Sequence, residues 1–271
     1  MKPRELWLFG TLWSLRQYPS KSREWSWAKK FSALREAGFD GVFSPPLPFL
    51  AERGHLRYLA VTSLGVDSEF TKPFRDAKAL GALAIDVQLC DWDTPLADAV
   101  KVALKIREAA GKEGLPFAIE NHRDTFTETP EKTLALAEAY QAACGEVMPC
   151  CLDHSHYAVV RHLKPADFWE YLRQPESLLQ AATQLHLRPF NGHHCQIPVL
   201  FANGRRTPEY KDWLAYATSL LRYLKDQPAE TPVLAVPEIG NAAPPYGLSC
   251  FPDTWKDVVT VVKDLRHVWA K

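Results

Sequence analysis

The feature that most constrains the fold of this chain is a regular alternation of strand-like and helix-like segments. Eight short runs are rich in apolar, β-branched or aromatic residues, at 6–12, 41–44, 58–62, 84–89, 117–121, 148–153, 184–188 and 233–238. A helical or helix-like segment follows each run. Alternation of this kind predicts a parallel sheet, because parallel neighbours need a crossover connection. Eight repeats within about 250 residues predict closure into an α/β (β/α)8 TIM barrel.

Helix signals agree with this pattern. Residues 25–37 and 96–110 carry apolar side chains at helical spacing. Thr129 followed by Pro130 predicts a helix start, with threonine as the N-cap and proline at the first helical position. Three more prolines mark similar starts: Pro165, Pro208 and Pro252. Residues 45–54 allow only a short helix, so the second repeat is the weakest.

A doubly wound open sheet is the alternative fold. No GxGxxG motif follows the first strand, so a dinucleotide-binding fold has no positive support. The chain contains no low-complexity segment and no linker. We therefore expect residues 1–271 to form a single barrel domain.

Charge and composition exclude several classes of protein. Lys+Arg and Asp+Glu both number 32, so the net charge is zero and nucleic-acid binding is disfavoured. No window of 18 uninterrupted apolar residues exists to span a membrane, and residues 6–13 are interpreted as the first strand rather than a signal peptide. None of the six cysteines forms a CxxC pair, which favours free thiols and a cytoplasmic location.

Two long connections follow the seventh and eighth strands, at 189–207 and 239–251. In a barrel both would lie on the carboxyl face, where they could form a lid or a substrate wall, or simply pack on the surface. Near the first strand, Trp7, Phe9 and Trp13 could likewise form an apolar wall of a binding site or part of the core.

Each of four consecutive strands carries an ionisable residue at its carboxyl end: Glu120, Asp153, His186 and Glu238. Along the seventh strand, polar residues (Gln184, His186 and Arg188) alternate with Leu185 and Leu187. The polar face must point into the barrel, because the helix-facing layer is apolar. The four ionisable side chains are therefore expected to converge at the barrel mouth.

Three carboxylates at close range repel one another in a low-dielectric site, and a divalent cation relieves that repulsion. Three oxygen ligands and one imidazole favour Mn²⁺ or Mg²⁺ and also suit Co²⁺ or Zn²⁺. Taken singly, His186 could be a hydrogen-bonded core histidine, and Asp153 and Glu238 could cap helices. His154 is expected to be structural, because it points to the opposite face from Asp153.

These residues resemble a known family. The segments Glu120-Asn121-His122-Arg123, Asp153-x-x-His156, His186-x-Arg188 and Pro237-Glu238-Ile239-Gly240 resemble the sugar phosphate isomerase/epimerase superfamily of xylose isomerase-like TIM barrels. That superfamily includes tagatose epimerases, hydroxypyruvate isomerases, inosose dehydratases and endonuclease IV. The resemblance covers the C-terminal two-thirds of the chain.

The resemblance implies that Glu120, Asp153, His186 and Glu238 bind one divalent metal and that both glutamates serve as the acid/base pair. It also implies that His156 contacts a substrate oxygen and that Arg188 binds substrate, although Arg188 is closer to His186 than in the epimerases. Three further residues are candidate substrate contacts: Gln88, His122 and His194. Gln88 shares a strand face with Asp86 and Cys90, so it could instead belong to a polar layer of the barrel core.

The implied activity is isomerisation or epimerisation of a sugar, keto-sugar or polyol through an enediolate. A metal-dependent dehydratase is the alternative, because the same intermediate can expel a β-hydroxyl. A catalytically inactive binding protein is a third reading. An abasic-site endonuclease is disfavoured, because the third and fourth strands carry no histidine. The expected partner is a small carbohydrate, with neither nucleic acid nor membrane, and analogy allows a homodimer.

Overall fold

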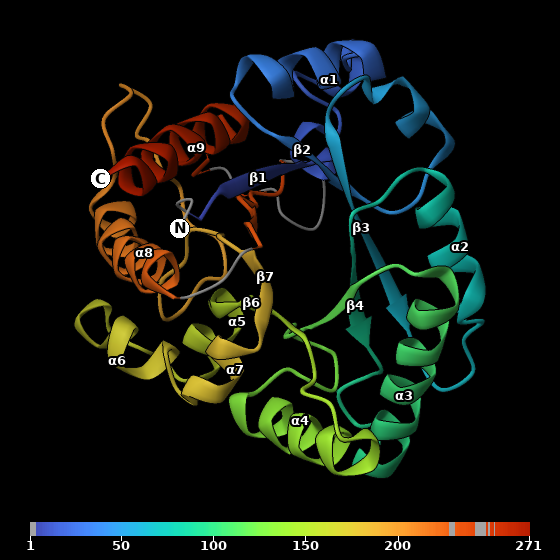
Figure 1. Ribbon diagram of the computed structural model, residues 1–271. Helices are drawn as coiled ribbons and strands as arrows, with labels where there is room; N and C mark the ends of the chain where they lie inside the picture. The colour runs from blue at the N-terminus through green and yellow to red at the C-terminus, as the bar shows by residue number, and fades with distance from the viewer. Residues whose placement is uncertain (1–3, 228–230, 242–247, 249, 252) are drawn as a thin grey trace.

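The computed structural model describes residues 4–227, 231–241, 248, 250–251 and 253–271. Within these residues, eight parallel strands close into a barrel in sequence order, each pairing with the next and β8 with β1 (Figure 1). The strands are β1 (Leu6–Thr11), β2 (Gly41–Ser44), β3 (Arg57–Leu64), β4 (Ile85–Leu89), β5 (Phe117–Glu120), β6 (Cys150–Asp153), β7 (Ala182–His186) and β8 (Val233–Val236). The predicted (β/α)8 barrel is confirmed.

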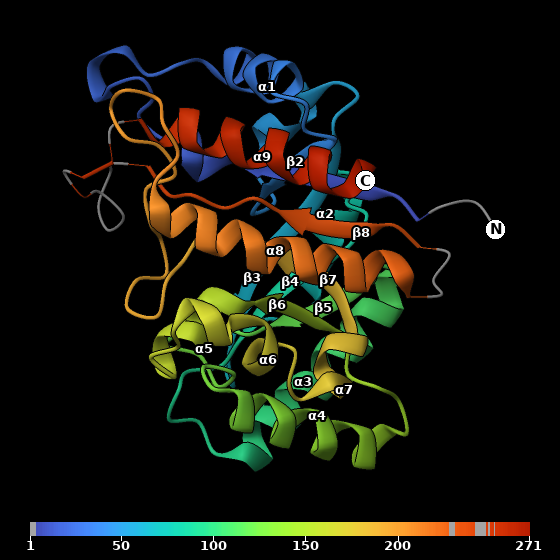
Figure 2. The same ribbon diagram turned by 90° about the vertical axis from the view of Figure 1, so that its left-hand side faces the viewer.

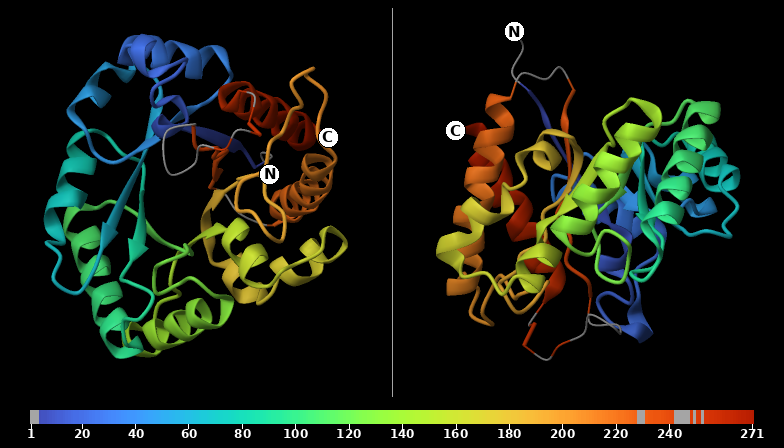
Figure 3. Two further views of the ribbon diagram at one scale, coloured as in Figure 1. Left: turned by 180° about the vertical axis from the view of Figure 1, so that it is seen from behind. Right: turned by 90° about the horizontal axis from the view of Figure 1, so that it is seen from below.

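Helices surround the strands as an outer ring, seen from opposite sides in Figure 1 and in the left panel of Figure 3. They are α1 (Trp27–Glu36), α2 (Thr71–Ala79), α3 (Leu96–Glu113), α4 (Pro130–Cys144), α5 (His154–Val160), α6 (Phe168–Leu172), α7 (Glu176–Gln180), α8 (Pro208–Asp226) and α9 (Thr254–Ala270). The second repeat has only a 3-10 helix, Pro48–Arg53, as the sequence predicts.

The helix starts follow from local chemistry. Thr129 caps α4 by accepting a hydrogen bond from the Lys132 backbone N–H. Thr207 caps α8 in the same way, and Pro165 begins a 3-10 turn that leads into α6. Pro252 lies outside the described residues. Asp253 is the N-cap of α9, which begins at Thr254.

Side-chain alternation divides the core into two layers. The outward residues of the strands, such as Ile85 and Val87, pack with the helices. Inside the barrel, the half formed by β1, β2, β3 and β8 is apolar, and its buried members include Phe9, Phe43, Leu59, Val61 and Val236. The inward residues of β4 to β7 include buried polar groups (Asp86, Glu120, Asp153, Gln184 and His186). The half of the barrel interior formed by β4 to β7 therefore holds the buried polar and ionisable groups.

Strand ends differ slightly from the sequence-based expectation. β7 ends at His186 and β8 at Val236, so Arg188 and Glu238 lie two residues beyond the strands. Pro189 and Pro237 follow closely, and proline has no N–H with which to extend a strand ladder. Both side chains are thereby placed on the rim of the barrel.

The long connection between β7 and α8 lies at the left-hand end of the barrel in Figure 2, opposite the end of α9. The connection after β8 is described only in part, and Pro244, Pro245 and Gly247 lie outside the described residues. In the described part of the chain, no helix combines the length and the apolar character needed to cross a membrane.

Candidate metal centre and active site

A cavity of about 380 Å³ opens at the carboxyl end of the barrel. One wall is apolar and the other is polar and ionisable. The lining residues are Trp13, Phe43, Pro45, Pro46, Val61, Thr62, Ser63, Gln88, Glu120, His122, His186, Arg188 and Glu238. This combination of an apolar wall with convergent polar groups is typical of a small-molecule site.

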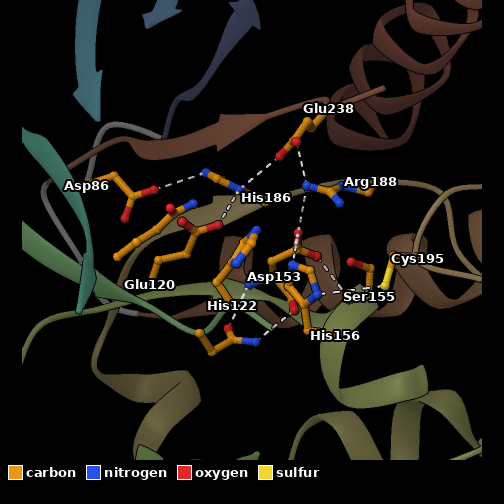
Figure 4. A network of polar contacts seen from close by, with 12 residues as sticks. Asp86, Glu120, His122, Asp153, Ser155, His156, His186, Arg188, Cys195 and Glu238 are labelled. Atoms are coloured by element: carbon orange, nitrogen blue, oxygen red, sulfur yellow. Dashed lines mark hydrogen bonds and ion pairs between the residues drawn. The ribbon is translucent and has the colours of Figure 1, made fainter. Parts of the chain in front are cut away.

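The strand ends bring the ionisable side chains together beside this cavity, and all of them except Asp153 line it. Glu120, Asp153 and His186 are the last residues of β5, β6 and β7, and Glu238 follows β8 by two residues. The Cα atom of Asp153 is in register with that of His186, which is in register with Val236. All four side chains are buried (Figure 4).

Neighbouring side chains hold the ends of β5 and β6 in place. The Asn121 amide donates to the Asp153 carbonyl at 2.8 Å, and its oxygen accepts from the Asp153 N–H at 2.8 Å. The Thr127 hydroxyl donates to the Glu120 carbonyl at 2.5 Å. These bonds satisfy backbone groups at the points where the ladder stops, so the two carboxylates are presented from a rigid rim.

Asp153 has two tasks. Its Oδ1 accepts from the Ser155 N–H at 2.9 Å and thereby caps α5. Its Oδ2 instead faces the cluster, at 3.4 Å from both His156 Nε2 and an Arg188 nitrogen. Asp153 therefore caps α5 and also belongs to the ionisable cluster.

His186 lies at the centre of the cluster (Figure 4). Its Nδ1 lies 3.0 Å from Glu120 Oε1 and 3.1 Å from Glu238 Oε2. Its Nε2 lies 3.3 Å from Asp86 Oδ2. The Phe43 ring packs against the imidazole edge to face, with ring centroids 5.0 Å apart. The ring is thus held between carboxylates on both of its nitrogens.

Arg188 supplies a buried positive charge. Its guanidinium forms an ion pair with Glu238 and lies 3.4 Å from Asp153 Oδ2. The Trp13 indole N–H donates to the same Glu238 carboxylate at 3.3 Å. The carboxylates on this side of the cluster are therefore partly neutralised by the chain itself.

The charges on the cluster are mutually dependent. Burial opposes ionisation of Glu238, but Arg188 and His186 outweigh it and hold the pKa of Glu238 well below its ordinary value. The same balance lowers the pKa of Asp153 through Arg188 and that of Glu120 through His186. Burial and the nearby Glu120 instead raise the pKa of Asp86 to about 7. Most of the cluster is therefore anionic at neutral pH.

The described residues fit a divalent metal. Each of the four residues has a buried atom without a hydrogen-bond partner in the described part of the chain, among them Glu120 Oε2, Asp153 Oδ2, His186 Nδ1 and Glu238 Oε2. Ligand atoms of Glu120, Asp153 and His186 lie within 4.8 Å of one another. Buried carboxylate and imidazole atoms without hydrogen bonds are costly unless another group binds them.

The predicted substrate contacts are not all in one place. Gln88 and His122 line the cavity, and Gln88 accepts a hydrogen bond from Ser63 at 3.0 Å. His156 is buried behind Asp153, with its ring 4.4 Å from that of His122. His194 is exposed and lies in a separate cavity of about 560 Å³, beside Asn191. The structure therefore brings Gln88, His122, His156 and Arg188, but not His194, beside the candidate metal ligands.

The structure also shows where His154, the aromatic residues near β1 and the cysteines lie. His154 is buried, and its Nδ1 contacts the Tyr216 hydroxyl, which agrees with a structural role. Among the aromatic residues, Trp13 lines the cavity, Phe9 is buried in the barrel interior, and Trp7 lies in a cavity at the other end of the molecule with Arg4 and Trp269. All six cysteines are free.

Sequence reasoning gave no role to two residues near the cluster. Asp86 contacts His186, and the available signal was an aspartate in an apolar strand on the same face as Gln88. Cys195, whose Sγ lies 3.7 Å from His156 Nδ1, belongs to the long connection after β7. A cysteine in a loop carries no pattern that would reveal this contact.

The fold and the site together define a (β/α)8 barrel with a buried carboxylate–histidine cluster at its carboxyl mouth. No protein-family model matches the sequence, and no curated protein matches it. Solved structures do match. They include D-psicose 3-epimerase from Clostridium cellulolyticum H10 (TM-score 0.63, 12% identity, 97% of this chain and 99% of that one). The probable 3-DHS dehydratase AsbF from Bacillus anthracis also matches (TM-score 0.60, 13% identity, 96% and 98%).

A third match is a xylose isomerase-like TIM barrel protein from Mycobacterium smegmatis, solved in complex with magnesium (TM-score 0.54, 14% identity, 99% of this chain and 98% of that one). The fold of this chain is therefore that of the xylose isomerase-like TIM barrels, in agreement with the resemblance found in the sequence.

Proposed function

We propose that this chain is a divalent-metal-dependent isomerase or epimerase of a sugar or keto-sugar. The observation that carries the proposal is the convergence of Glu120, Asp153, His186 and Glu238 in one buried cluster at the ends of four consecutive strands, with Glu120, His186 and Glu238 lining the cavity. The cavity, at about 380 Å³, has room for a monosaccharide. The structural neighbours named as a sugar 3-epimerase and a magnesium-containing barrel support the same class.

The four residues would hold the metal, with Mn²⁺ and Mg²⁺ favoured by the oxygen-rich donor set. When bound, a divalent cation would stabilise negative charge that develops on carbonyl and hydroxyl oxygens of the substrate.

Proton transfer falls to the two glutamates. Both line the cavity, and both contact the same nitrogen of His186 from different strands. One glutamate removes the proton next to the carbonyl, and the other delivers a proton to the same or the adjacent carbon. The ion pair with Arg188 favours the ionised form of Glu238, as a general base requires, and the carboxyl group that acts as the acid must enter the step protonated.

The cavity walls provide binding and exclude water. Trp13, Phe43 and Val61 offer an apolar surface to the carbon face of a sugar. Gln88 and His122 offer hydrogen bonds to its hydroxyl groups. A dehydratase is the second candidate, favoured by the match to the probable dehydratase, because the same proton abstraction precedes loss of a β-hydroxyl.

The test is proton exchange with solvent. We expect the protein, purified without chelators, to contain about one divalent metal per chain and to incorporate deuterium from D₂O into a ketose, an inosose or a keto-acid. Glu120→Gln should lower that rate by about 10²–10⁴-fold. Glu146→Gln, a matched change at an exposed surface ion pair, should leave it unchanged.

The product distinguishes the two candidate reactions, because epimerisation keeps the substrate mass and dehydration removes one water. Full exchange activity in Glu120→Gln would exclude Glu120 as an acid or base. A wild-type chain that takes up no divalent metal would overturn both reactions.

A further inference from the structure

Asp86 is a buried carboxylate below the proposed metal ligands. It lies on β4, where its Cα is in register with Ala118, and Gln88 two residues later is in register with Glu120. Side chains two residues apart on a strand share a face, so Asp86 occupies the next interior position below the level of Glu120. Its exposed fraction is zero.

The surroundings of Asp86 contain few polar groups. Neither of its oxygens has a hydrogen-bond partner of good geometry among the described residues. His186 Nε2, at 3.3 Å from Oδ2, and the Cys151 thiol are the neighbours that offset its charge. Burying a charged carboxylate costs free energy unless nearby groups compensate it. Because few groups do so for Asp86, we expect its carboxylate to accept a hydrogen bond from a neighbouring side chain.

His186 provides that partner through the chemistry of its ring. A neutral imidazole has one N–H and one nitrogen lone pair. Nδ1 of His186 faces Glu120 and Glu238, whereas Nε2 faces Asp86 on the other side of the ring (Figure 4). If Nδ1 binds a metal, the hydrogen must be on Nε2, where Asp86 is placed to accept it.

We propose that Asp86 is the positioning residue of His186. By accepting the Nε2–H it fixes the ring orientation and the tautomer, and it directs the Nδ1 lone pair toward the three other carboxylates. The inference rests on the metal centre proposed above. Carboxylates that hold a metal-binding histidine in this way typically account for 10- to 100-fold in metal affinity.

A second metal between Asp86, Cys151 and His186 is the competing interpretation, because their ligand atoms also lie within 4.8 Å of one another. It would require both nitrogens of His186 to bind metal, which leaves the ring without a proton. The positioning role needs only the neutral imidazole that metal-binding histidines usually provide.

The first test is Mn²⁺ affinity, measured by competition with a chelator on the intact chain. Asp86→Leu, similar in size but without an acceptor, should weaken binding by about 10- to 100-fold at an unchanged stoichiometry of one. Asp86→Asn keeps an acceptor oxygen and should stay closer to the wild type than to Asp86→Leu. Equal losses in the two variants would indicate a charge effect alone and would overturn the positioning role.

Cys151→Ser is the matched control from the same interior layer, and its Mn²⁺ affinity should be unchanged. Unchanged affinity in Asp86→Leu overturns the inference while leaving the metal centre intact. Two ions per wild-type chain, one of them lost in both Asp86→Leu and Cys151→Ser, also overturns it. Absence of Mn²⁺ binding to the wild type overturns this inference together with the proposed function.

A second measurement does not depend on the variants folding. In the Zn²⁺-loaded wild-type chain with ¹⁵N-labelled histidine, NMR should show His186 with a proton on Nε2 and without one on Nδ1. A spectrum in which Nε2 carries the metal, or in which neither nitrogen carries a proton, contradicts the proposal.

Discussion

At the scale of single residues, the site is a balance of buried charges. Asp86, Glu120, Asp153 and Glu238 are all buried within one region of the barrel interior. Arg188 and His186 are the cationic or potentially cationic side chains that contact them directly there, with His156 beside Asp153. Such a cluster persists only where cations or hydrogen bonds compensate each carboxylate.

Arg188 provides the first prediction at this scale. Arg188→Met removes the positive charge between Asp153 and Glu238 while keeping much of the side-chain volume. Breaking a buried ion pair typically costs about 3–5 kcal/mol, so the metal-free variant should unfold more easily than the wild type by about that amount. Because a divalent cation would supply the missing charge, added Mn²⁺ should stabilise the variant more than the wild type.

Thermal and urea unfolding with and without Mn²⁺ measure both effects. The control is Arg107→Met, at an exposed pair with Glu146, which should leave the stability close to that of the wild type and show the wild-type response to Mn²⁺. If Arg188→Met were as stable as the wild type without metal, Arg188 would not compensate the charges of Asp153 and Glu238.

At the scale of elements, a buried side chain of α9, Asp257, holds the long connection after β7 in place. Asp257 on α9 accepts hydrogen bonds from the backbone N–H groups of Val199 and Leu200, at 3.1 and 3.0 Å. Burial raises the pKa of Asp257 to about 6, a shift that these two bonds oppose and Asp253 increases. Ionisation of Asp257 therefore destabilises the folded state.

The sign of the resulting pH dependence follows from linkage. As pH rises from about 4 to about 6, Asp257 is deprotonated in the unfolded chain but still protonated in the folded one. Its contribution to the free energy of unfolding should then fall by about 1.4 kcal/mol per pH unit, about 3 kcal/mol in all. We expect urea unfolding across this range to show that the free energy of unfolding of the wild type falls relative to that of Asp257→Asn as pH rises.

Asp212→Asn, at an exposed position on α8, serves as the control and should run parallel to the wild type. Parallel pH profiles for Asp257→Asn and the wild type would contradict the predicted titration.

At the scale of the whole molecule, the proposed metal joins distant parts of the chain. Its ligands lie at the ends of β5, β6, β7 and β8, and the first and last are 118 residues apart, from Glu120 to Glu238. The unfolded chain cannot present this arrangement, so metal binding should stabilise the folded barrel as a unit. The expected gain is about 2.7 kcal/mol at 100 times the dissociation constant.

Urea unfolding at increasing Mn²⁺ concentration tests this coupling, and addition of a chelator should reverse the gain. His186→Ala should lose most of the dependence on Mn²⁺. The cation does not bind at this cluster if the urea midpoint of the wild type does not change with Mn²⁺. The same conclusion follows if the midpoint of His186→Ala shifts as much as that of the wild type.

The barrel and most of the cluster could be predicted from the sequence, because they depend on local patterns. Alternating strand and helix segments, helix N-caps such as Thr129, and side-chain parity on a strand are short-range properties. Parity alone directs His186 inward, and barrel closure then brings it together with Glu120, Asp153 and Glu238.

Tertiary structure decided the contacts between strands that are far apart in sequence. Asp86 meets His186 from 100 residues away, and Cys195 reaches His156 from a loop. It also placed His194 outside the cavity and seated Arg188 between two carboxylates. These outcomes depend on strand register, on loop path and on which side of a ring faces which neighbour. Local sequence does not encode them, because they are set only when the barrel closes.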